Sequence, residues 1–327
     1  MHIPENYLSP STCAILGAVM IPVWLTAVKK VKEEVPKDKL PLIGIGAAFS
    51  FLSMMFNIPL PGGTTGHAVG GTLIAILFGP WSACLAVSVA LLIQAVFFGD
   101  GGILAFGANC FNMALVLPFS GYFIYNLLKE KISPTVAAGI GGYVGINLAA
   151  LCAAIEFGIQ PLLFTDSAGQ ALYCPYPLSI SIPAMMIGHL TIFGLAEVIF
   201  TAAVFAFLQK TSPDLFNKSQ KSSGKFAYIL AAVLIVFTPL GLLAEGTAWG
   251  EWAPEEIAEL EVDGQALGYT PVGMEEGFAF DAFFPDYTVS GLPDEFAYIL
   301  SAVIGTALLI IFFKVLASML GGRASYQ

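Results

Sequence analysis

Charged side chains are scarce in this 327-residue chain. Asp, Glu, Lys and Arg together make up 11% of the residues, whereas an ordinary soluble domain carries about a quarter. Hydrophobic residues make up 57%, and several continuous apolar stretches approach the roughly 20 residues that a helix needs to cross a bilayer. Continuous rather than alternating stretches argue against a transmembrane β-barrel. The composition therefore predicts an all-α polytopic membrane protein, and a net charge of −10 gives no sign of a nucleic-acid partner.

Several chemical motifs are also missing. The five cysteines have no CxxC or other paired spacing, so we expect neither a thiolate metal site nor a disulfide framework, but small packing residues. A GxxxxGK[ST] sequence is absent, so the chain brings no P-loop ATPase of its own. It also has no HExxH, and no nucleophile–base pattern that would indicate an active site. We therefore expect no enzymatic activity, no catalytic residues and no catalytic cofactor.

Nine apolar segments are expected to cross the membrane. The third is too short for an ordinary span, but keeping it separate from the fourth places all 13 Lys and Arg residues on or near the inner side, as the positive-inside rule requires. We expect this short segment to lie against protein rather than lipid along part of its length. The predicted crossings are residues 9–28, 40–57, 68–79, 81–98, 102–127, 134–157, 181–208, 226–245 and 296–319.

The chain ahead of the first span carries no positive charge. Lys29, Lys30 and Lys32 instead follow that span, whereas a cleaved signal peptide places its positive charge in front. We therefore expect an uncleaved first span, with Met1 retained outside and, after nine crossings, a cytoplasmic C-terminus.

A Lys- and Ser-rich stretch divides the chain. It predicts a seven-span core over residues 1–210, a cytoplasmic linker over 211–225, and a two-span domain over 226–327 with a large acidic extracellular loop at 246–295. Eleven of the 23 acidic residues lie from Glu251 to Asp294. These carboxylates would raise the local cation concentration, or the loop is simply solvated; the sequence leaves both interpretations open.

Histidine occurs three times, and two of the three fall on the predicted outer face. In a chain that begins Met1-His2, the α-amine, the backbone nitrogen of His2 and its Nδ1 can close a five- and a six-membered ring around one metal. His67, in a glycine-rich outer loop, can supply a fourth nitrogen. Planar nitrogen coordination favours Ni(II) or Cu(II). The alternatives are a chance histidine after the initiator and a merely solvated loop histidine.

Two further groups of polar residues are candidates. His189 and Glu197 lie inside the 181–208 span, where ionisable groups are costly and often functional, although a hydrogen-bonded structural role fits equally well. The second group stands near the outer ends of the fourth and fifth spans, where its members would orient metal-bound imidazoles or join helices. This group consists of Gln94, Asp100, Asn109 and Asn112.

Four motifs in order carry a family resemblance. They are MHIPENYLSP (1–10), PGGTTGHA (61–68), FFGDGG (97–102) and FGANCFNM (106–113). Residues 1–210 resemble the CbiM/NikM family, the substrate-binding membrane subunits of energy-coupling-factor transporters for cobalt and nickel. The resemblance implies a seven-span core with the N-terminus outside and inserted into the core. It also implies a metal held by the Met1 amine, the backbone nitrogen and ring of His2, and the ring of His67.

The C-terminal part resembles the two-span N subunit, or PDGLE-type domain, often fused to this family. It carries FPDYTVSGLP (284–293) before the last span, although the full PDGLE string is absent. The family resemblance implies ATP-driven uptake of nickel and/or cobalt across a prokaryotic cell (inner) membrane, with a transmembrane coupling subunit and cytoplasmic ATPases as partners.

The alternative is a self-sufficient secondary metal carrier or channel. Such a protein should show inverted repeats and several charges at the membrane midplane. The sequence offers no convincing repeat, and only His189 and Glu197 lie deep in a span.

Overall fold

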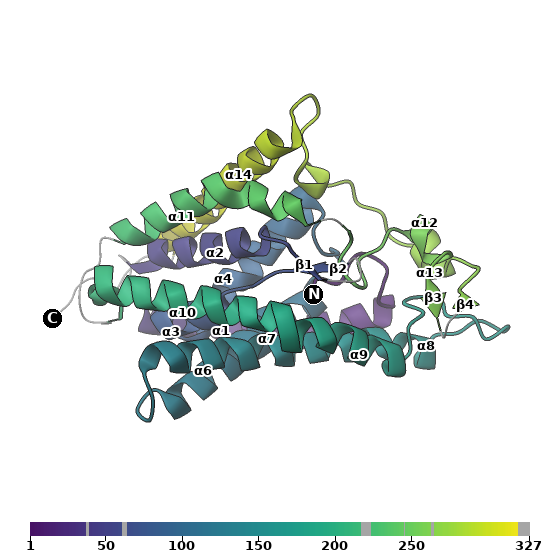
Figure 1. The fold of residues 1–327 in the computed structure, drawn as a ribbon, viewed down its shortest axis with the longest axis horizontal. Coiled ribbons are helices and arrows are strands. Elements are labelled where there is room, and N and C mark those ends of the chain that lie inside the picture. The colour runs from purple at the N-terminus through teal and green to yellow at the C-terminus, as the bar shows by residue number, and fades with distance from the viewer. Residues whose placement is uncertain (37–38, 61–63, 217–223, 245, 263–264, 320–327) are drawn as a thin grey trace.

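The computed structural model describes residues 1–36, 39–60, 64–216, 224–244, 246–262 and 265–319. It is a bundle of long helices running in roughly parallel and antiparallel directions, with short elements gathered at one end (Figure 1). The α-helices are α1 (Pro10–Glu34), α2 (Leu40–Met54), α3 (Gly71–Phe78), α4 (Pro80–Ile93), α5 (Phe106–Asn109), α6 (Leu117–Leu128), α7 (Pro134–Gly158), α8 (Gln160–Leu163), α9 (Leu178–Gly188), α10 (Gly194–Thr211), α11 (Lys225–Phe237), α12 (Pro254–Ile257), α13 (Val272–Glu275) and α14 (Asp294–Met319). The strands form two small antiparallel pairs, β1 (Ile58–Leu60) with β2 (Thr64–Gly66) and β3 (Glu261–Val262) with β4 (Gln265–Ala266).

All nine predicted crossings contain a helix. In the described part of the chain, seven helical stretches are long and apolar enough to span a membrane, so the all-α polytopic class is confirmed. They are Pro10–Glu34, Pro80–Phe98, Phe106–Leu128, Pro134–Leu163, Leu178–Thr211, Lys225–Leu243 and Asp294–Met319. The remaining two helices, α2 and α3, are shorter, with 15 and 8 residues.

Helix α3 does not cross a bilayer by itself. Its 8 residues span about 12 Å at 1.5 Å per residue. Gly70 (φ 72°) precedes it and Gly79 (φ 91°) ends it, and both have the positive φ that suits glycine. Pro80 then opens α4 in the first helical turn, where proline is tolerated. The residues from Gly71 to Ala75 are buried, so the short segment lies against protein along part of its length, as predicted.

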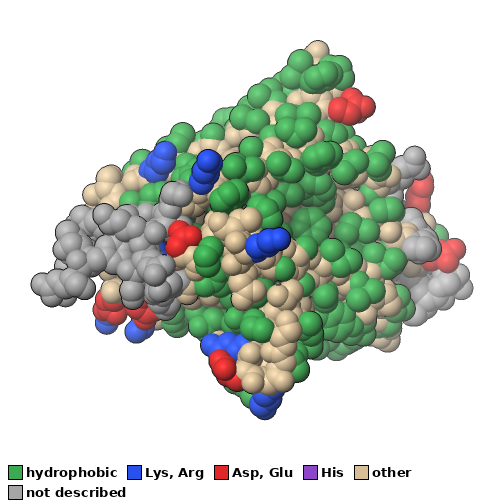
Figure 2. All heavy atoms as spheres, turned by 60° about the vertical axis from the view of Figure 1, so that its left-hand side comes forward, with side chains coloured by type: hydrophobic (Ala, Val, Ile, Leu, Met, Phe, Trp, Pro, Cys, Tyr) green, Lys and Arg blue, Asp and Glu red, His purple; other side chains and the backbone are tan. Residues whose placement is uncertain are grey.

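The two ends of the bundle differ in charge. Basic side chains surround the end at the left of Figure 1, which Figure 2 turns forward, while hydrophobic side chains cover the flanks. The described lysines close α1, precede α2, follow α6, end α10, start α11 and lie near the end of α14. Lys37, Lys218, Lys221 and Arg323, which the charge argument also used, lie outside the described residues, as do 217–223 of the predicted linker. The short elements α12, α13, β3 and β4 gather at the opposite end (Figure 1).

The last helix packs closely on α2 through two glycines. A Cβ at Gly305 of α14 would lie 2.3 Å from Phe51 Cζ, and one at Gly44 of α2 would lie 3.0 Å from Phe313 Cβ. Small residues at such crossings let helix backbones approach, which maximises van der Waals contact in a membrane. Helices α11 and α14 therefore lie beside α2 rather than apart from the core (Figure 1).

Candidate functional site

The N-terminal segment is buried inside the protein. Met1, His2 and Ile3 expose 4%, 1% and 0% of their surface. The backbone N–H of Ile3 donates to Asn109 Oδ1 (2.8 Å), and Asn109 Nδ2 donates back to the Ile3 carbonyl (3.0 Å). The Gly102 N–H also donates to the Ile3 carbonyl, at 2.9 Å. This strand-like pairing satisfies main-chain groups that burial would otherwise leave unpaired.

The loop between α4 and α5 receives this segment. Glu5 accepts hydrogen bonds from the backbone nitrogens of Ile103 (2.6 Å) and Leu104 (3.2 Å). A Cβ at Gly102 would lie 2.8 Å from Glu5 Cα, so only glycine permits this approach. Further along, the Ser9 N–H donates to Gln160 Oε1 (3.0 Å), and the Ser9 side chain caps α1 by accepting from the Thr12 N–H. The segment is therefore fixed at several points before the first helix starts.

The burial brings two of the three histidines together. The ring centroids of His2 and His67 are 5.0 Å apart, with their planes inclined by 56°. His67 follows the β1–β2 hairpin directly, and its Nδ1 lies 3.3 Å from the Ala68 carbonyl. Burial lowers the pKa of His67 well below its usual value, and the electrostatic influence of the nearby His2 ring and N-terminal amine lowers it further. His67 is therefore neutral near pH 7, the form in which imidazole binds metals.

Glu197 of α10 fixes the chain just after His67. Its carboxylate is fully buried and accepts hydrogen bonds from the backbone nitrogens of Val69 (2.8 Å) and Gly70 (3.1 Å) at the start of α3. Thr201 Oγ1 donates to the other carboxylate oxygen at 3.2 Å. A carboxylate at a helix N-terminus meets unpaired N–H groups and the positive end of the helix dipole. The intramembrane acid identified in the sequence thus holds the segment that carries His67.

Asp100 links the His2 ring to other polar groups. Its Oδ1 contacts His2 Nδ1 closely, while its Oδ2 accepts from Gln94 Nε2 (2.9 Å) and from Tyr287 Oη (2.5 Å). Burial raises the pKa of the Asp100 carboxyl, but the electrostatic interaction with His2 and the hydrogen bonds from His2 and Tyr287 outweigh it, so the pKa lies below its usual value. Asp100 is therefore an ionised acceptor for the imidazole.

The acidic loop closes over the N-terminus. The Met1 α-amine pairs with Glu251 Oε1 at 3.0 Å. Tyr7 Oη donates to the Trp252 carbonyl (2.7 Å), and Asn6 exchanges two side-chain hydrogen bonds with the backbone of Phe278 (2.9 and 3.0 Å). The loop is thus a packed cover and not only a solvated acidic segment.

The other polar residues predicted from the sequence lie in three different places. Gln94, Asp100 and Asn109 surround the N-terminal segment, with Gln94 acting through Asp100. Asn112 instead donates to Glu156 Oε2 on α7 at 2.8 Å. His189 Nδ1 bonds the Met185 carbonyl at 2.8 Å within its own helix.

Sequence reasoning missed two residues of the C-terminal domain, Glu251 and Tyr287. Glu251 is the first acid of the acidic loop, and Tyr287 lies inside the FPDYTVSGLP motif. Both lie in segments that the sequence analysis singled out, but nothing in the sequence connected either residue to the N-terminus.

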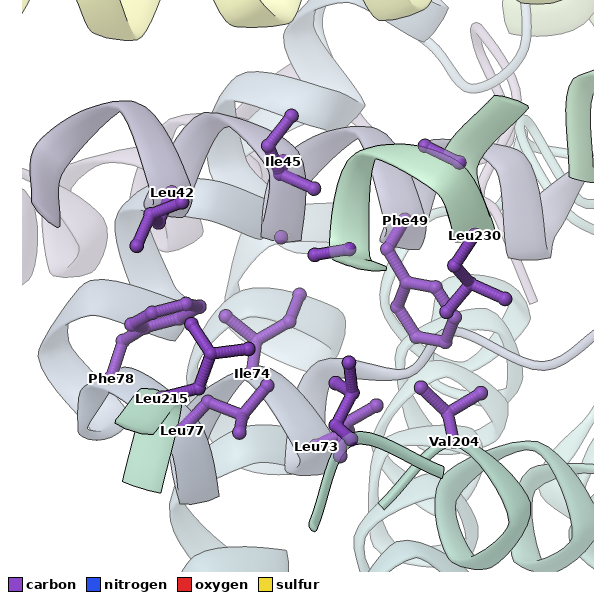
Figure 3. A pocket seen from close by; sticks show the side chains of 14 residues that line it. Leu42, Ile45, Phe49, Leu73, Ile74, Leu77, Phe78, Val204, Leu215 and Leu230 are labelled. Carbon is purple, nitrogen blue, oxygen red and sulfur yellow. The ribbon is translucent and has the colours of Figure 1, made fainter. Parts of the chain in front are cut away.

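A small apolar cavity lies elsewhere, between α2, α3, α10 and α11 (Figure 3). Its volume is about 30 Å³, and its lining, which includes Leu42, Phe49, Leu73 and Leu230, carries no metal-ligating side chain. Dry apolar cavities of this kind favour neither water nor ions. This cavity is therefore no candidate for a metal site.

Side chains alone do not complete a metal site here. Within the described ranges, no group of three or more His, Cys, Asp or Glu side chains is arranged to hold a metal ion. The histidine pair nevertheless adjoins a buried main-chain terminus, and His2 Nε2 is buried without a hydrogen-bond partner. Further ligands at this pair would therefore have to come from groups other than these side chains.

The fold and site define a multi-pass α-helical membrane protein whose buried N-terminus meets a histidine pair. The chain belongs to the CbiM family, because the model of the cobalt uptake substrate-specific transmembrane region matches residues 2–215. A PDGLE domain model matches residues 223–322. The family predicted from the four motifs, of cobalt and nickel transport proteins, is therefore confirmed.

Full-length relatives share both parts. The chain is 51% identical over 313 residues to the "Probable fused nickel transport protein LarMN" of Lactiplantibacillus plantarum, covering 95% of each chain. It is 46% identical over 330 residues to the fused nickel transport protein NikMN of Rhodobacter capsulatus, again covering 95% of each. A crystal structure of a transition metal transporter is 53% identical, with a TM-score of 0.63 over 70% of this chain and 99% of that chain.

Proposed function

We propose that this chain is the substrate-binding subunit of an ATP-driven energy-coupling-factor transporter that takes up nickel and/or cobalt ions. The observation that carries the proposal is the meeting of His2 and His67, 5.0 Å apart between ring centroids, beside a buried N-terminal amine. The names of the fused nickel transport relatives support nickel as a substrate.

The proposed ligands are four nitrogens. The Met1 amine and the His2 backbone nitrogen close a five-membered ring around the metal, and the His2 backbone nitrogen and Nδ1 close a six-membered ring. His67 supplies the fourth nitrogen. A planar nitrogen set suits Ni(II), and the same atoms accept Co(II). Histidine ligands commonly donate their second ring nitrogen to a carboxylate; a half-turn of the His2 ring would present Nδ1 to the metal and bring Nε2 toward Asp100.

The organisation of the transporter is part of the same proposal. The chain comprises a metal-binding core at 1–210, a cytoplasmic linker at 211–225 and a two-span domain at 226–327, with its N-terminus outside a prokaryotic cell membrane. The basic end of the bundle (Figure 2) supports this orientation. The sequence has no P-loop, which fits ATP hydrolysis by separate cytoplasmic partners reached through a transmembrane coupling subunit.

The binding site is tested by titrating the purified chain, carrying no histidine tag, with Ni(II) in a calorimeter. His67→Ala is expected to weaken binding by more than about 100-fold, because even residues behind the ligands cost 10–100-fold. His189→Gln is the matched control, since His189 bonds within its own helix, and it should bind as the native chain does. Equal affinities for all three proteins would refute the site, and a parallel titration with Co(II) ranks the two metals.

A second experiment separates the proposal from a self-sufficient carrier or channel. The chain alone in liposomes should bind metal yet give no sustained uptake, and uptake should require the coupling and ATPase subunits. Sustained uptake by the chain alone would favour the carrier.

A further inference from the structure

Two consecutive residues of the C-terminal domain have a strained backbone conformation near the proposed metal site. In the described residues, three non-glycine residues have positive φ: Asn6 (65°), Asp286 (52°) and Tyr287 (60°). Asn6 belongs to the buried N-terminal segment, and the other two are consecutive. Backbone strain of this kind costs free energy and persists where the surroundings fix it, often at functional sites. Surrounding contacts must therefore stabilise the conformation of Asp286 and Tyr287.

The strained turn delivers one side chain into the core. The Tyr287 ring stacks on Phe98, with centroids 4.8 Å apart and planes within 18°, and also lies against Phe51 and Tyr298. Ser301 Oγ donates to the Tyr287 carbonyl at 3.0 Å. The ring is thus held by three aromatic neighbours and at its backbone, which fixes where the hydroxyl lies.

That hydroxyl ends a chain of hydrogen bonds that reaches the proposed ligand. Tyr287 Oη donates to Asp100 Oδ2 at 2.5 Å and accepts from Gln94 Nε2 at 3.1 Å. The other oxygen of Asp100 contacts Nδ1 of the His2 ring, so the half-turn proposed above must replace Nδ1 by Nε2 on the Asp100 side before Nδ1 binds the metal. The two oxygens of Asp100 are therefore divided, one toward the domain that supplies Tyr287 and one toward the imidazole.

We propose that Tyr287 is a positioning residue for metal binding, which fixes the Asp100 carboxylate and through it the orientation of the His2 ring. This inference rests on the proposed function. Tyr287 lies in the part of the chain matched by the PDGLE model and outside the part matched by the CbiM model. The C-terminal domain thus completes the surroundings of a metal site whose ligands all come from the core.

The test compares Tyr287→Phe with Tyr298→Phe in the full-length chain. The first variant keeps the aromatic stack and removes only the hydroxyl at Asp100. The second removes a neighbouring hydroxyl that donates to the Met55 carbonyl at 2.9 Å, within the same aromatic cluster. We expect Tyr287→Phe to weaken Ni(II) binding about 10-fold or more and to shift the ligand-field absorption of bound Ni(II). Tyr298→Phe should change neither quantity.

A double-mutant cycle decides whether Tyr287 acts through Asp100. In an Asp100→Ala background, Tyr287→Phe should cause no further loss of affinity, because its partner is already gone. Equal losses in both backgrounds, or native affinity and absorption in Tyr287→Phe, would overturn the inference while leaving the metal site intact. If the native chain and Tyr298→Phe also fail to bind Ni(II), the proposed function falls and this inference falls with it.

Discussion

Replacing Glu197 by Ala should damage metal binding from a distance. Glu197 touches neither proposed histidine ligand, but its carboxylate holds the backbone nitrogens of Val69 and Gly70, two and three residues after His67. Alanine leaves both N–H groups buried without a partner and frees the segment between β2 and α3. The His67 ring then loses its fixed position relative to His2.

The size of the effect follows from the lost bonds. A buried N–H left unpaired costs about 1–3 kcal/mol, so two of them cost about 2–6 kcal/mol. Removing a buried carboxylate also relieves its desolvation cost, so global stability should fall by less. If about 2 kcal/mol of this reduces the population of the binding-competent arrangement, apparent Ni(II) affinity falls about 30-fold.

Two further variants make the assay specific. Glu197→Gln retains one acceptor oxygen, and because both N–H groups reach Oε2 (2.8 and 3.1 Å), it should recover most of the affinity. Thr201→Val removes only the hydroxyl bond to Oε1 and should bind normally. Calorimetry with Ni(II), alongside thermal unfolding of the metal-free proteins, measures both quantities. Native affinity in Glu197→Ala, or equal affinities in the Ala and Gln variants, would refute the reasoning.

Two other predictions concern protons and packing. Ni(II) affinity should fall as pH is lowered, because binding releases protons from the Met1 amine and the His2 backbone nitrogen. Neutral His67 adds none, because its pKa is already depressed by burial, and a pH-independent affinity measured by calorimetry would contradict this. Gly305→Ala should lower the free energy of unfolding by about 1–3 kcal/mol, because its Cβ would lie 2.3 Å from Phe51. Gly17→Ala, where a Cβ meets nothing within 4 Å, should not.

Much of the fold was predictable because membrane physics is visible in sequence. Length and apolarity identify the spans, and the Gly79-Pro80 break separates α3 from α4, as the structure shows. The positive-inside rule likewise predicts that the lysines gather at one end of the bundle. Segments without a regular period were harder, and the short elements of the acidic loop had no such signal.

The candidate site was only partly predictable. His2 was identified by its position directly after Met1, and His67 by its glycine-rich loop. Both features can be recognised from residues adjacent in the sequence. The partner of Glu197 could not be inferred, since its bonds go to backbone nitrogens 127 and 128 residues away. Tyr287 and Asp100 are separated by 187 residues, and tyrosine in a loop has no pattern that predicts a contact at this range. Such contacts depend on tertiary packing, which a single sequence does not specify.

In the proposed site, the free Met1 amine is a metal ligand. The direct test is a full-length chain with a removable N-terminal extension, cleaved immediately before Met1 and purified without a histidine tag. The extension converts the Met1 amine into a peptide amide, and the buried site beside Glu251 leaves no other amine in its place. Calorimetric titration should detect no tight Ni(II) binding before cleavage and tight binding afterwards. Equally tight binding by the uncleaved chain would contradict the account.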